Sequence, residues 1–255
     1  MDLGLRGKRA LVLGGSTGLG FGAGKALAGE GATVALVART GQRLDAAAKS
    51  LGSHAMACDL SSPPEVEVLP HAAMSAMGHV DVVVLNGAGP PPLDASDFSA
   101  AVWRSQFETM LVSSISIAGA LIPSMRDRRF GRIILIASTS IVEPIPGLVL
   151  SNALRAGLHG WAKTLAGEVA CDGITVNTVM PGRIATDRTQ GLDEAEAKRT
   201  GRNVERIAAA SQAEIPVRRY GTADELGAVV AFLASERASY VNGARIAVDG
   251  GLLRN

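Results

Sequence analysis

Short apolar runs alternate with longer segments in which apolar residues recur every three or four positions, and this alternation extends along the whole chain. The runs stay apolar at successive positions, as is typical of strands buried on both faces of a parallel sheet. Strands are predicted at RALVL (9–13), TVALVA (33–38), HAMA (54–57), DVVVL (81–85), RIILIA (132–137), TVNTVM (175–180) and RIAVD (245–249). Helices are predicted near 18–30, 41–51, 62–77, 97–128, 149–171 and 222–235.

This order of elements predicts a single α/β domain over residues 1–255. We expect a Rossmann-type doubly wound fold, with a central parallel sheet of about seven strands flanked by helices. The segment 183–216 is rich in Ala, Arg and Glu, and we expect one or two helices there. An insertion at the carboxyl edge of such a sheet suits a lid over a ligand, although a surface excursion fits equally well.

Composition narrows the classes of partner. The chain has 255 residues, of which 47% are apolar and 19% charged, and its net charge is +1. This balance favours neither nucleic acid nor an anionic membrane as a partner. The amino-terminal residues lack the apolar run of a signal peptide, and we expect no membrane-spanning helix. Two cysteines and four scattered histidines predict no metal site and suit the cytoplasm.

The first predicted strand leads into GGSTGLG and then into a helix. Glycine at such positions lets the chain turn sharply and lets backbone N–H groups approach a pyrophosphate. The helix amino terminus adds partial positive charge at the same place. An ordinary glycine turn is the alternative. We therefore predict a dinucleotide site built from Gly14, Ser16, Thr17, Gly18, Leu19 and Gly20.

The second strand ends at Arg39, where a carboxylate would bind the ribose hydroxyls of NAD(H). An arginine suits the 2′-phosphate of NADP(H), so NADP(H) is favoured over NAD(H). A solvated loop charge is the alternative for this arginine. After the third strand, Asp59 could meet the adenine amino group, with Leu60 beside it. After the fourth, Asn86, Gly87 and Ala88 leave room for a ribose, although both stretches could be plain turns.

Further stretches carry a resemblance that extends over nearly the full length. They are the glycine turn, Asp59, NGAG (86–89), the GRIILIAS strand ending at Ser138, ITVNTVMPG and the terminal VNGARIAVDGG. Together they resemble the short-chain dehydrogenase/reductase superfamily, and within it the 3-oxoacyl-[acyl-carrier-protein] reductases. The resemblance implies an oxidoreductase acting on a small carbonyl compound or an acyl thioester, and a homo-tetramer or dimer. It adds to the coenzyme site Pro181, Gly182, Ile184 and Thr186.

The chain departs from this family at its catalytic positions. Members use Asn, Ser, Tyr and Lys, and Ser138 stands at the serine position. Thirteen residues on, the tyrosine position holds Ser151, and four further the lysine position holds Arg155. Met110 stands in place of the asparagine, and Leu13 replaces the threonine that opens the glycine motif. The resemblance therefore implies an atypical branch with a degenerate catalytic tetrad.

These changes leave two functional hypotheses. A serine hydroxyl is a far weaker acid than a phenol, and arginine stays protonated, although it can stabilise an oxyanion. In the first hypothesis, Ser138 and Ser151 bind the substrate oxygen, and Arg155 stabilises its charge and contacts the nicotinamide ribose. Water, His159 or Glu143 would supply the proton, although His159 also suits simple packing and Glu143 a solvated loop. In the second, the protein binds the nucleotide but serves as a scaffold without efficient catalysis.

Overall fold

The parallel sheet has seven strands within residues 2–254, the part of the chain that the computed structural model describes. Their order is β3-β2-β1-β4-β5-β6-β7, and all neighbouring pairs are parallel. The winding reverses between β1 and β4, so the ligand crevice is expected at their carboxyl ends. The strands are β1 (Arg9–Leu13), β2 (Thr33–Ala38), β3 (His54–Ala57), β4 (Val82–Leu85), β5 (Gly131–Ile136), β6 (Ile174–Pro181) and β7 (Arg245–Val248).

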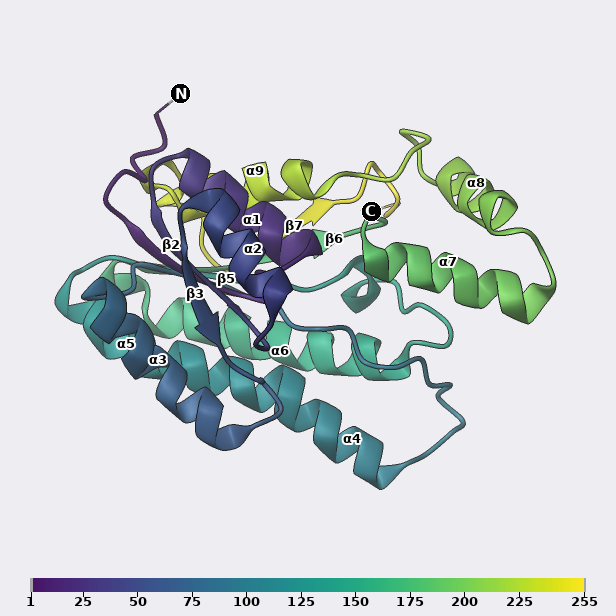
Figure 1. The fold of residues 1–255 in the computed structure, drawn as a ribbon, viewed down its shortest axis with the longest axis horizontal. Helices are drawn as coiled ribbons and strands as arrows, with labels where there is room; N and C mark the ends of the chain where they lie inside the picture. The colour runs from purple at the N-terminus through teal and green to yellow at the C-terminus, as the bar shows by residue number, and fades with distance from the viewer. Residues whose placement is uncertain (1, 255) are drawn as a thin grey trace.

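Two layers of helices cover the sheet (Figure 1). One layer contains α1 (Gly18–Gly29), α2 (Gln42–Leu51) and α9 (Ala223–Ala234). The other contains α3 (Pro63–Met77), α5 (Ser113–Asp127) and α6 (Val149–Glu168). Each layer buries its own cluster of apolar side chains against the sheet. This arrangement confirms the predicted doubly wound α/β architecture.

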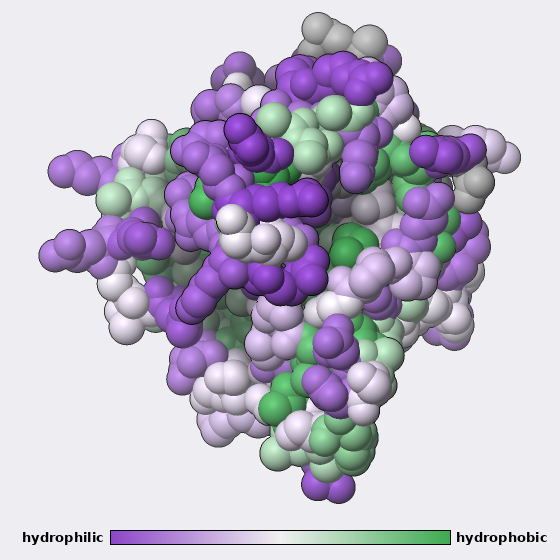
Figure 2. All heavy atoms as spheres, turned by 90° about the vertical axis from the view of Figure 1, so that its right-hand side faces the viewer, coloured by the Kyte–Doolittle hydropathy of each residue, from purple (hydrophilic) through white to green (hydrophobic). Residues whose placement is uncertain are grey.

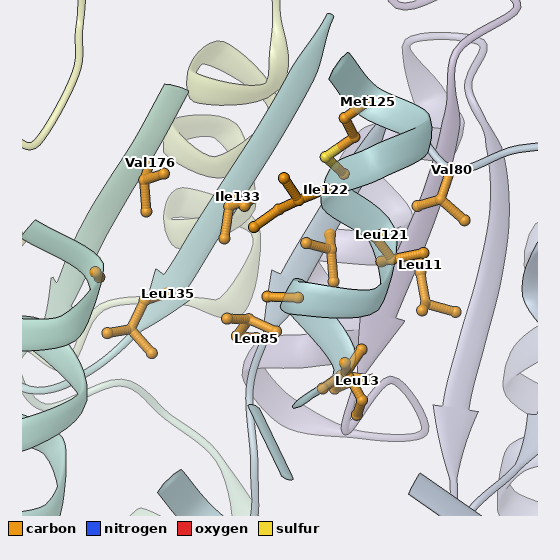
Figure 3. Close-up of a cluster of buried hydrophobic side chains, with 14 of the residues drawn as sticks. Leu11, Leu13, Val80, Leu85, Leu121, Ile122, Met125, Ile133, Leu135 and Val176 are labelled. Carbon is orange, nitrogen blue, oxygen red and sulfur yellow. The ribbon is translucent and has the colours of Figure 1, made fainter. Parts of the chain in front are cut away.

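Successive residues of β1 point into opposite layers, because side chains alternate along a strand. Leu11 and Leu13 belong to the cluster under α3, α5 and α6, whereas Ala10 and Val12 belong to the cluster under α1, α2 and α9. Figure 3 shows the first cluster, in which Leu121 of α5 lies near Leu11. Burying one leucine side chain contributes about 1.5–3 kcal/mol. The two clusters thus hold β1, and the turn that follows it, in place.

The prediction of strands buried on both faces holds for the inner strands and is wrong at the edges. Three of the four residues of β3 are exposed, and exposed residues alternate with partly buried ones along β7. These two strands lie at the ends of the sheet, where each has only one neighbouring strand. Fewer neighbours leave more of each side chain in contact with water.

The single helix predicted over 97–128 is interrupted. It consists of α4 (Ala100–Phe107), a π-helical turn at Glu108–Val112, and α5. A π-helical turn accommodates one extra residue within a helix, and such turns are frequent at functional sites. By length and composition alone, the stretch Ala100–Asp127 could cross a membrane. Its apolar residues Ile117, Leu121 and Met125 are instead buried in the core, which accounts for that composition.

The remaining helices follow the predicted pattern, except that α6 ends at Glu168 and a 3-10 turn follows at Ala170–Asp172. The segment 183–216 forms two helices, α7 (Asp187–Thr200) and α8 (Val204–Glu214). This α7–α8 segment begins after the carboxyl end of β6 and projects from that edge of the sheet (Figure 1). Figure 2 looks onto this side, where hydrophilic residues gather over the middle of the face.

Glycines let α1 and α9 approach each other closely. A Cβ added at Gly22 would overlap the backbone carbonyl of Ala223, and one at Gly227 would overlap the carbonyl of Gly22. The helices therefore pack backbone to backbone at this crossing. Because α1 begins at the glycine turn, this packing fixes the position of its amino terminus.

Candidate active site

The turn between β1 and α1 has no room for side chains at two of its glycines. Gly14 has a φ of +62°, and a Cβ there would lie 2.6 Å from Asn86 Nδ2. A Cβ at Gly20 would overlap the carbonyl oxygen of Gly14. Asn86 donates from Nδ2 to the carbonyl oxygen of Leu13 at 3.2 Å, which ties the end of β4 to the turn. The predicted residues Gly14, Gly20 and Asn86 are thus brought together.

The amino terminus of α1 is open to an anion. Thr17 occupies the N-cap position but makes no side-chain hydrogen bond to the helix. The N–H groups of the first turn and the helix dipole therefore favour a phosphate at this place. A Cβ added at Gly18 would lie 3.5 Å from Thr186 Cγ2, so Thr186 faces the turn across the site. Ser16 and Leu19 are half-buried in the same turn.

Arg39 and Asp59 lie at the carboxyl ends of the neighbouring strands β2 and β3. The Asp59 carboxylate accepts hydrogen bonds from Ser61 N at 2.9 Å and Ser61 Oγ at 2.7 Å. These bonds lower the pKa of Asp59, and the charge of Arg39 lowers it further. Arg39 is exposed and forms no ion pair with residues 2–254. Its guanidinium is available to a phosphate, and the cradle as a whole fits a dinucleotide.

The strands on either side of the crevice contribute the other predicted coenzyme residues. After β4, a Cβ at Gly87 would lie 4.0 Å from Leu60 Cδ1, and Ala88 is exposed. β6 ends at Pro181, and Gly182 follows it. Ile184 is buried, and Thr186 accepts a hydrogen bond from Thr189 N at 3.3 Å. That last bond caps α7. The coenzyme segment therefore leads directly into the α7–α8 segment.

Hydrogen bonds from Arg155 connect Ser151 on α6 with the end of β5, where Ser138 lies. Arg155 Nη1 donates to the carbonyl oxygens of Ile136 at 2.9 Å and Ala137 at 3.0 Å, where β5 ends beside Ser138. Arg155 Nε donates to Ser151 Oγ at 3.2 Å, one turn earlier on α6. Ser138 Oγ accepts a hydrogen bond from the backbone N–H of Ser140 at 3.1 Å. Its own hydroxyl proton therefore remains free to be donated. The three predicted catalytic residues therefore gather at the carboxyl end of β5.

The side chain of Arg155 is partly buried. Burial lowers its pKa to about 10, and the nearby charge of Arg188 acts in the same direction. Arg155 forms no ion pair with any described residue, and its three hydrogen bonds end on neutral oxygens. It is a cation at the end of β5 without a counter-charge, which suits it to stabilise developing negative charge.

Met110 lies in the π-helical turn and is buried against Leu150 and Leu154. Its side chain offers no strong hydrogen bond at the position where the resemblance places an asparagine. A cavity of about 20 Å³ lies between Met110 and Arg155, and it has room for one water molecule. The neighbourhood of Arg155 is therefore mostly apolar on this side.

The two candidate proton donors lie elsewhere. His159 Nδ1 is 3.0 Å from Thr178 Oγ1, and burial, with the charges of Arg245 and Lys163, lowers the pKa of His159. This contact favours the interpretation of His159 as a packed, neutral residue. Glu143 is exposed in the loop after β5, as expected of a solvated charge. Neither side chain has a hydrogen bond to the serines or Arg155 in the described structure.

Neither tyrosine of the chain stands in for the missing phenol. Tyr220 donates to Asp193 Oδ2 at 2.8 Å, and Tyr240 is fully exposed. Asp193 is buried and also lies 3.4 Å from Arg183 Nη1. Tyr220 thus anchors α7 to the loop before α9 and has no bond to the serines in the described structure.

Sequence reasoning missed Arg188. The segment 183–216 was predicted only as one or two helices rich in Ala, Arg and Glu, but its Arg188 reaches the loop after β4. Arg188 Nη2 donates to the carbonyl oxygen of Pro90 at 2.9 Å, and a Cβ at Gly89 would lie 3.1 Å from Arg188 Nε. No local signal could have identified it, since the contact spans 98 residues of sequence.

Comparison with known proteins gives concordant matches. The family model described as enoyl-(acyl carrier protein) reductase matches residues 14–253. Nodulation protein G of Rhizobium sp. is 35% identical over 250 residues, covering 97% of this chain and 98% of the relative. The 3-oxoacyl-[acyl-carrier-protein] reductase of Escherichia coli is 34% identical over 248 residues, covering 96% and 97%. L-Sorbose reductase of Gluconobacter frateurii, solved with NADPH and L-sorbose, has a TM-score of 0.94 at 33% identity, covering 100% of each chain.

These matches extend through the glycine turn, the end of β5, α6 and the α7–α8 segment. Positions 110, 151 and 155 therefore lie within the matched region, and the fold of the chain agrees with that of the solved sorbose reductase over its full length. The chain belongs to the short-chain dehydrogenase/reductase superfamily, in the family whose model is described as enoyl-(acyl carrier protein) reductase.

Proposed function

We propose that the protein is an NADP(H)-dependent oxidoreductase that reduces a carbonyl group or oxidises the corresponding alcohol. The observation that carries this proposal is the position of Ser138, Ser151 and Arg155 at the end of β5, on the same carboxyl edge of the sheet as the glycine turn after β1. The solved relative bound to NADPH and a sugar supports it.

The coenzyme side of the proposal rests on charge and space. The pyrophosphate would lie over Gly14, Gly18 and Gly20 at the amino terminus of α1, where side chains are excluded. The 2′-phosphate would lie beside Arg39, which supports NADP(H) over NAD(H). The adenosine and ribose groups would lie among Asp59, Leu60 and Asn86–Ala88. The opposite side of the coenzyme would be covered by Pro181–Thr186.

The chain's own residues would orient and stabilise the substrate. When bound, NADPH supplies the hydride. Ser138 and Ser151 would each donate an O–H to the substrate oxygen, because the oxygen of each hydroxyl already accepts an N–H. Arg155 would stabilise the negative charge that develops on that oxygen and contact the nicotinamide ribose. The final proton would come from solvent, since neither His159 nor Glu143 has a hydrogen bond to the serines.

Small ketones and 3-oxoacyl thioesters are the substrate classes to examine, because the Escherichia coli relative is a 3-oxoacyl-[acyl-carrier-protein] reductase. The test follows NADPH absorbance with both classes, for the wild-type protein and for Ser138→Ala and Arg155→Gln. We expect turnover that Arg155→Gln lowers by about 10²–10³-fold, the usual effect of losing an oxyanion donor. Turnover that neither substitution changes would contradict the proposed site.

A second function is favoured by one observation, which is the lack of a phenol bonded to Arg155 or the serines in the described structure. General acid–base assistance contributes about 10²–10⁴-fold to such reactions. A nucleotide-binding scaffold would bind NADPH tightly and turn over none of the substrates. Single-turnover mixing with excess enzyme separates it from a slow enzyme, which would still oxidise one equivalent of NADPH.

We also propose how the whole molecule is organised. Residues 1–255 form one domain, and the α7–α8 segment acts as a lid over the substrate. Large apolar side chains remain exposed at Phe98, Phe107 and Tyr240, which supports assembly into a homo-dimer or homo-tetramer. Two free cysteines suit a reducing cytoplasm. Sedimentation equilibrium tests the assembly, and a monomer at micromolar concentration would contradict it.

A further inference from the structure

Two arginines converge on the loop that follows β4. Gly87 lines the small cavity beside Arg155, and Arg188 packs over Gly89 and donates to Pro90. Arg155 comes from α6 and Arg188 from the first turn of α7, so two helices far apart in the sequence each bring a cation to this loop. The charge of Arg188 is close enough to lower the pKa of Arg155.

Acidic residues do not neutralise this pair in the described structure. The ion pairs between residues 2–254 include neither Arg155 nor Arg188. Asp187, next in sequence, lies 3.8 Å from Arg43 instead. Asp94 is exposed, and it adds only slightly to the raised pKa of Arg199, which is due mainly to the hydrogen bond and charge of Glu196. The crevice thus carries two positive charges with no carboxylate bonded to them.

The donors of Arg155 are only partly used. A guanidinium has five N–H groups, of which Nε and Nη1 donate to Ser151, Ile136 and Ala137. Nη2 has no hydrogen-bond partner in the described chain. A partly buried cation is stabilised when an anion accompanies it. Both the charge and the free donors therefore favour an anionic group at this place.

We propose that the natural substrate is an oxo acid whose carboxylate binds between Arg155 and Arg188 while Ser138 and Ser151 hold its carbonyl oxygen. This inference rests on the proposed function and specifies its substrate class, a free oxo acid in preference to a neutral thioester. A planar carboxylate matches the fork of a guanidinium. The coenzyme pyrophosphate is accounted for separately, at the glycine turn and the amino terminus of α1.

The reaction balances with the proposed coenzyme alone. The carbonyl carbon gains a hydride from NADPH, which is oxidised to NADP+, and the C=O π bond becomes a C–O single bond. The oxygen gains one proton from solvent, while the carboxylate stays ionised throughout. The hydroxy acid formed keeps its contact with the arginines, so the charge of the site does not change during turnover.

The test compares oxo acids with their methyl esters, which differ only in charge at the carboxyl group. Pyruvate, acetoacetate and levulinate place the carboxylate at increasing distance from the carbonyl. For the best of the three, we expect kcat/KM with NADPH to exceed that of its ester by about 10–100-fold, the range of one or two charge-assisted hydrogen bonds. Calorimetric titration of each oxo acid into the protein–NADPH complex should show the same preference.

Arg188→Gln supplies the second measurement, with Arg199→Gln as the matched control on the same helix. Arg199 pairs with Glu196 at 2.6 Å on the exposed face of α7. We expect Arg188→Gln to reduce the acid-to-ester ratio by about tenfold or more and Arg199→Gln to leave it unchanged. Thermal unfolding of both variants checks that α7 remains folded.

The possible outcomes distinguish failure of the anion site from failure of the proposed function. Esters that bind and react as well as the acids would overturn the inference while leaving the oxidoreductase intact. An Arg188→Gln variant that weakens NADPH binding without changing the acid-to-ester ratio would assign Arg188 to the coenzyme and also overturn it. If no compound is turned over, the proposed function fails. Preferential binding of the acids in calorimetry would then still support the anion site.

Discussion

The hydroxyl of Ser151 accepts a hydrogen bond from Arg155 Nε at 3.2 Å, so its own proton is free for another acceptor. A carbonyl oxygen in the crevice is the natural acceptor, and Ser138 offers a second O–H beside it. Two hydroxyls and a cation can hold an oxyanion, but a serine does not release its proton readily. At the scale of single residues, the site is therefore better suited to electrostatic stabilisation than to acid catalysis.

Restoring the family residues tests whether proton supply limits the reaction. We expect the double variant Ser151→Tyr/Arg155→Lys to raise kcat for carbonyl reduction by about 10²–10⁴-fold, the contribution of a general acid. Met110 stays unchanged, because it is packed against Leu150 and Leu154. A folded variant with the wild-type rate would show that proton delivery is not limiting. Stopped-flow oxidation of NADPH and a thermal unfolding scan provide the two measurements.

Because the pKa of Arg155 is lowered, we expect kcat/KM to depend on pH. The sequence alone predicted that this arginine stays protonated, but burial and, to a smaller extent, the charge of Arg188 lower its pKa to about 10, so we expect the guanidinium to lose its charge above that pH. Stabilisation of the oxyanion should therefore disappear as pH rises through 10, and kcat/KM should fall about tenfold per pH unit beyond it. The profile of Arg155→Gln should lack this break. A wild-type profile that stays level through that range would contradict the assignment.

Spacing in the sequence predicted much of the site at this scale. The glycine turn, Arg39, Asp59, Ser138 and the pair on α6 each follow a recognisable strand or helix, and the structure places them along one edge of the sheet. Arg188 could not be predicted, because its role depends on how α7 folds back over the loop after β4. A charged residue in a charged segment carries no such information.

At the scale of elements, the crossing of α1 and α9 positions the phosphate end of the site. The two helices meet through glycine, and α1 begins at the coenzyme turn. A second contact fixes the α7–α8 segment, where buried Asp193 accepts from Tyr220 and lies near Arg183. The first contact is rigid backbone packing, and the second depends on two polar bonds. We expect α1 to be more stable locally than α7.

Gly22→Ala tests the helix crossing, with Gly29→Ala as the control in the same helix. The new methyl group at position 22 would overlap the carbonyl of Ala223, whereas nothing lies within 4 Å at position 29. We expect Gly22→Ala to lower the free energy of unfolding by roughly 1–3 kcal/mol and to weaken NADPH binding. Gly29→Ala should be neutral or slightly stabilising. Equal unfolding midpoints in denaturant would contradict the close packing.

Tyr220→Phe tests the anchor of the α7–α8 segment. The substitution leaves the buried Asp193 carboxylate with one partner, which typically costs about 1–3 kcal/mol. Because the loss is local, we expect faster trypsin cleavage within 187–214 and little change in the melting temperature. Tyr240→Phe, at a fully exposed position, should cleave at the wild-type rate. Indistinguishable cleavage of the two variants would show that Tyr220 does not anchor the segment.

Elements were predictable where the apolar pattern determines them. The predicted bounds of β1, β2 and β3 match the structure, and the apolar runs of β1 and β2 end directly before Gly14 and Arg39. The π-helical turn at Glu108–Val112 was not predicted, because apolar residues continue on both sides of it and the whole stretch was interpreted as one long helix. The exposure of β3 and β7 depends on strand order, which the local pattern does not contain.

At the scale of the whole molecule, the doubly wound topology explains why distant residues share one crevice. The winding reverses between β1 and β4, so the ends of β2, β1, β4, β5 and β6 open onto the same edge. Arg39 lies at one end of this edge and Arg155 toward the other. A dinucleotide extended along the edge would join the two, with its phosphates at α1 between them.

The most direct test of this account is calorimetric titration of the wild-type protein and Arg39→Asp with NADPH and NADH. We expect NADPH to bind the wild-type protein at least about tenfold more tightly than NADH, because the 2′-phosphate gains a charge-assisted bond to Arg39. Arg39→Asp should remove or reverse that preference. No heat with either nucleotide, or equal affinities unchanged by the substitution, would contradict the coenzyme site on which the proposed function depends.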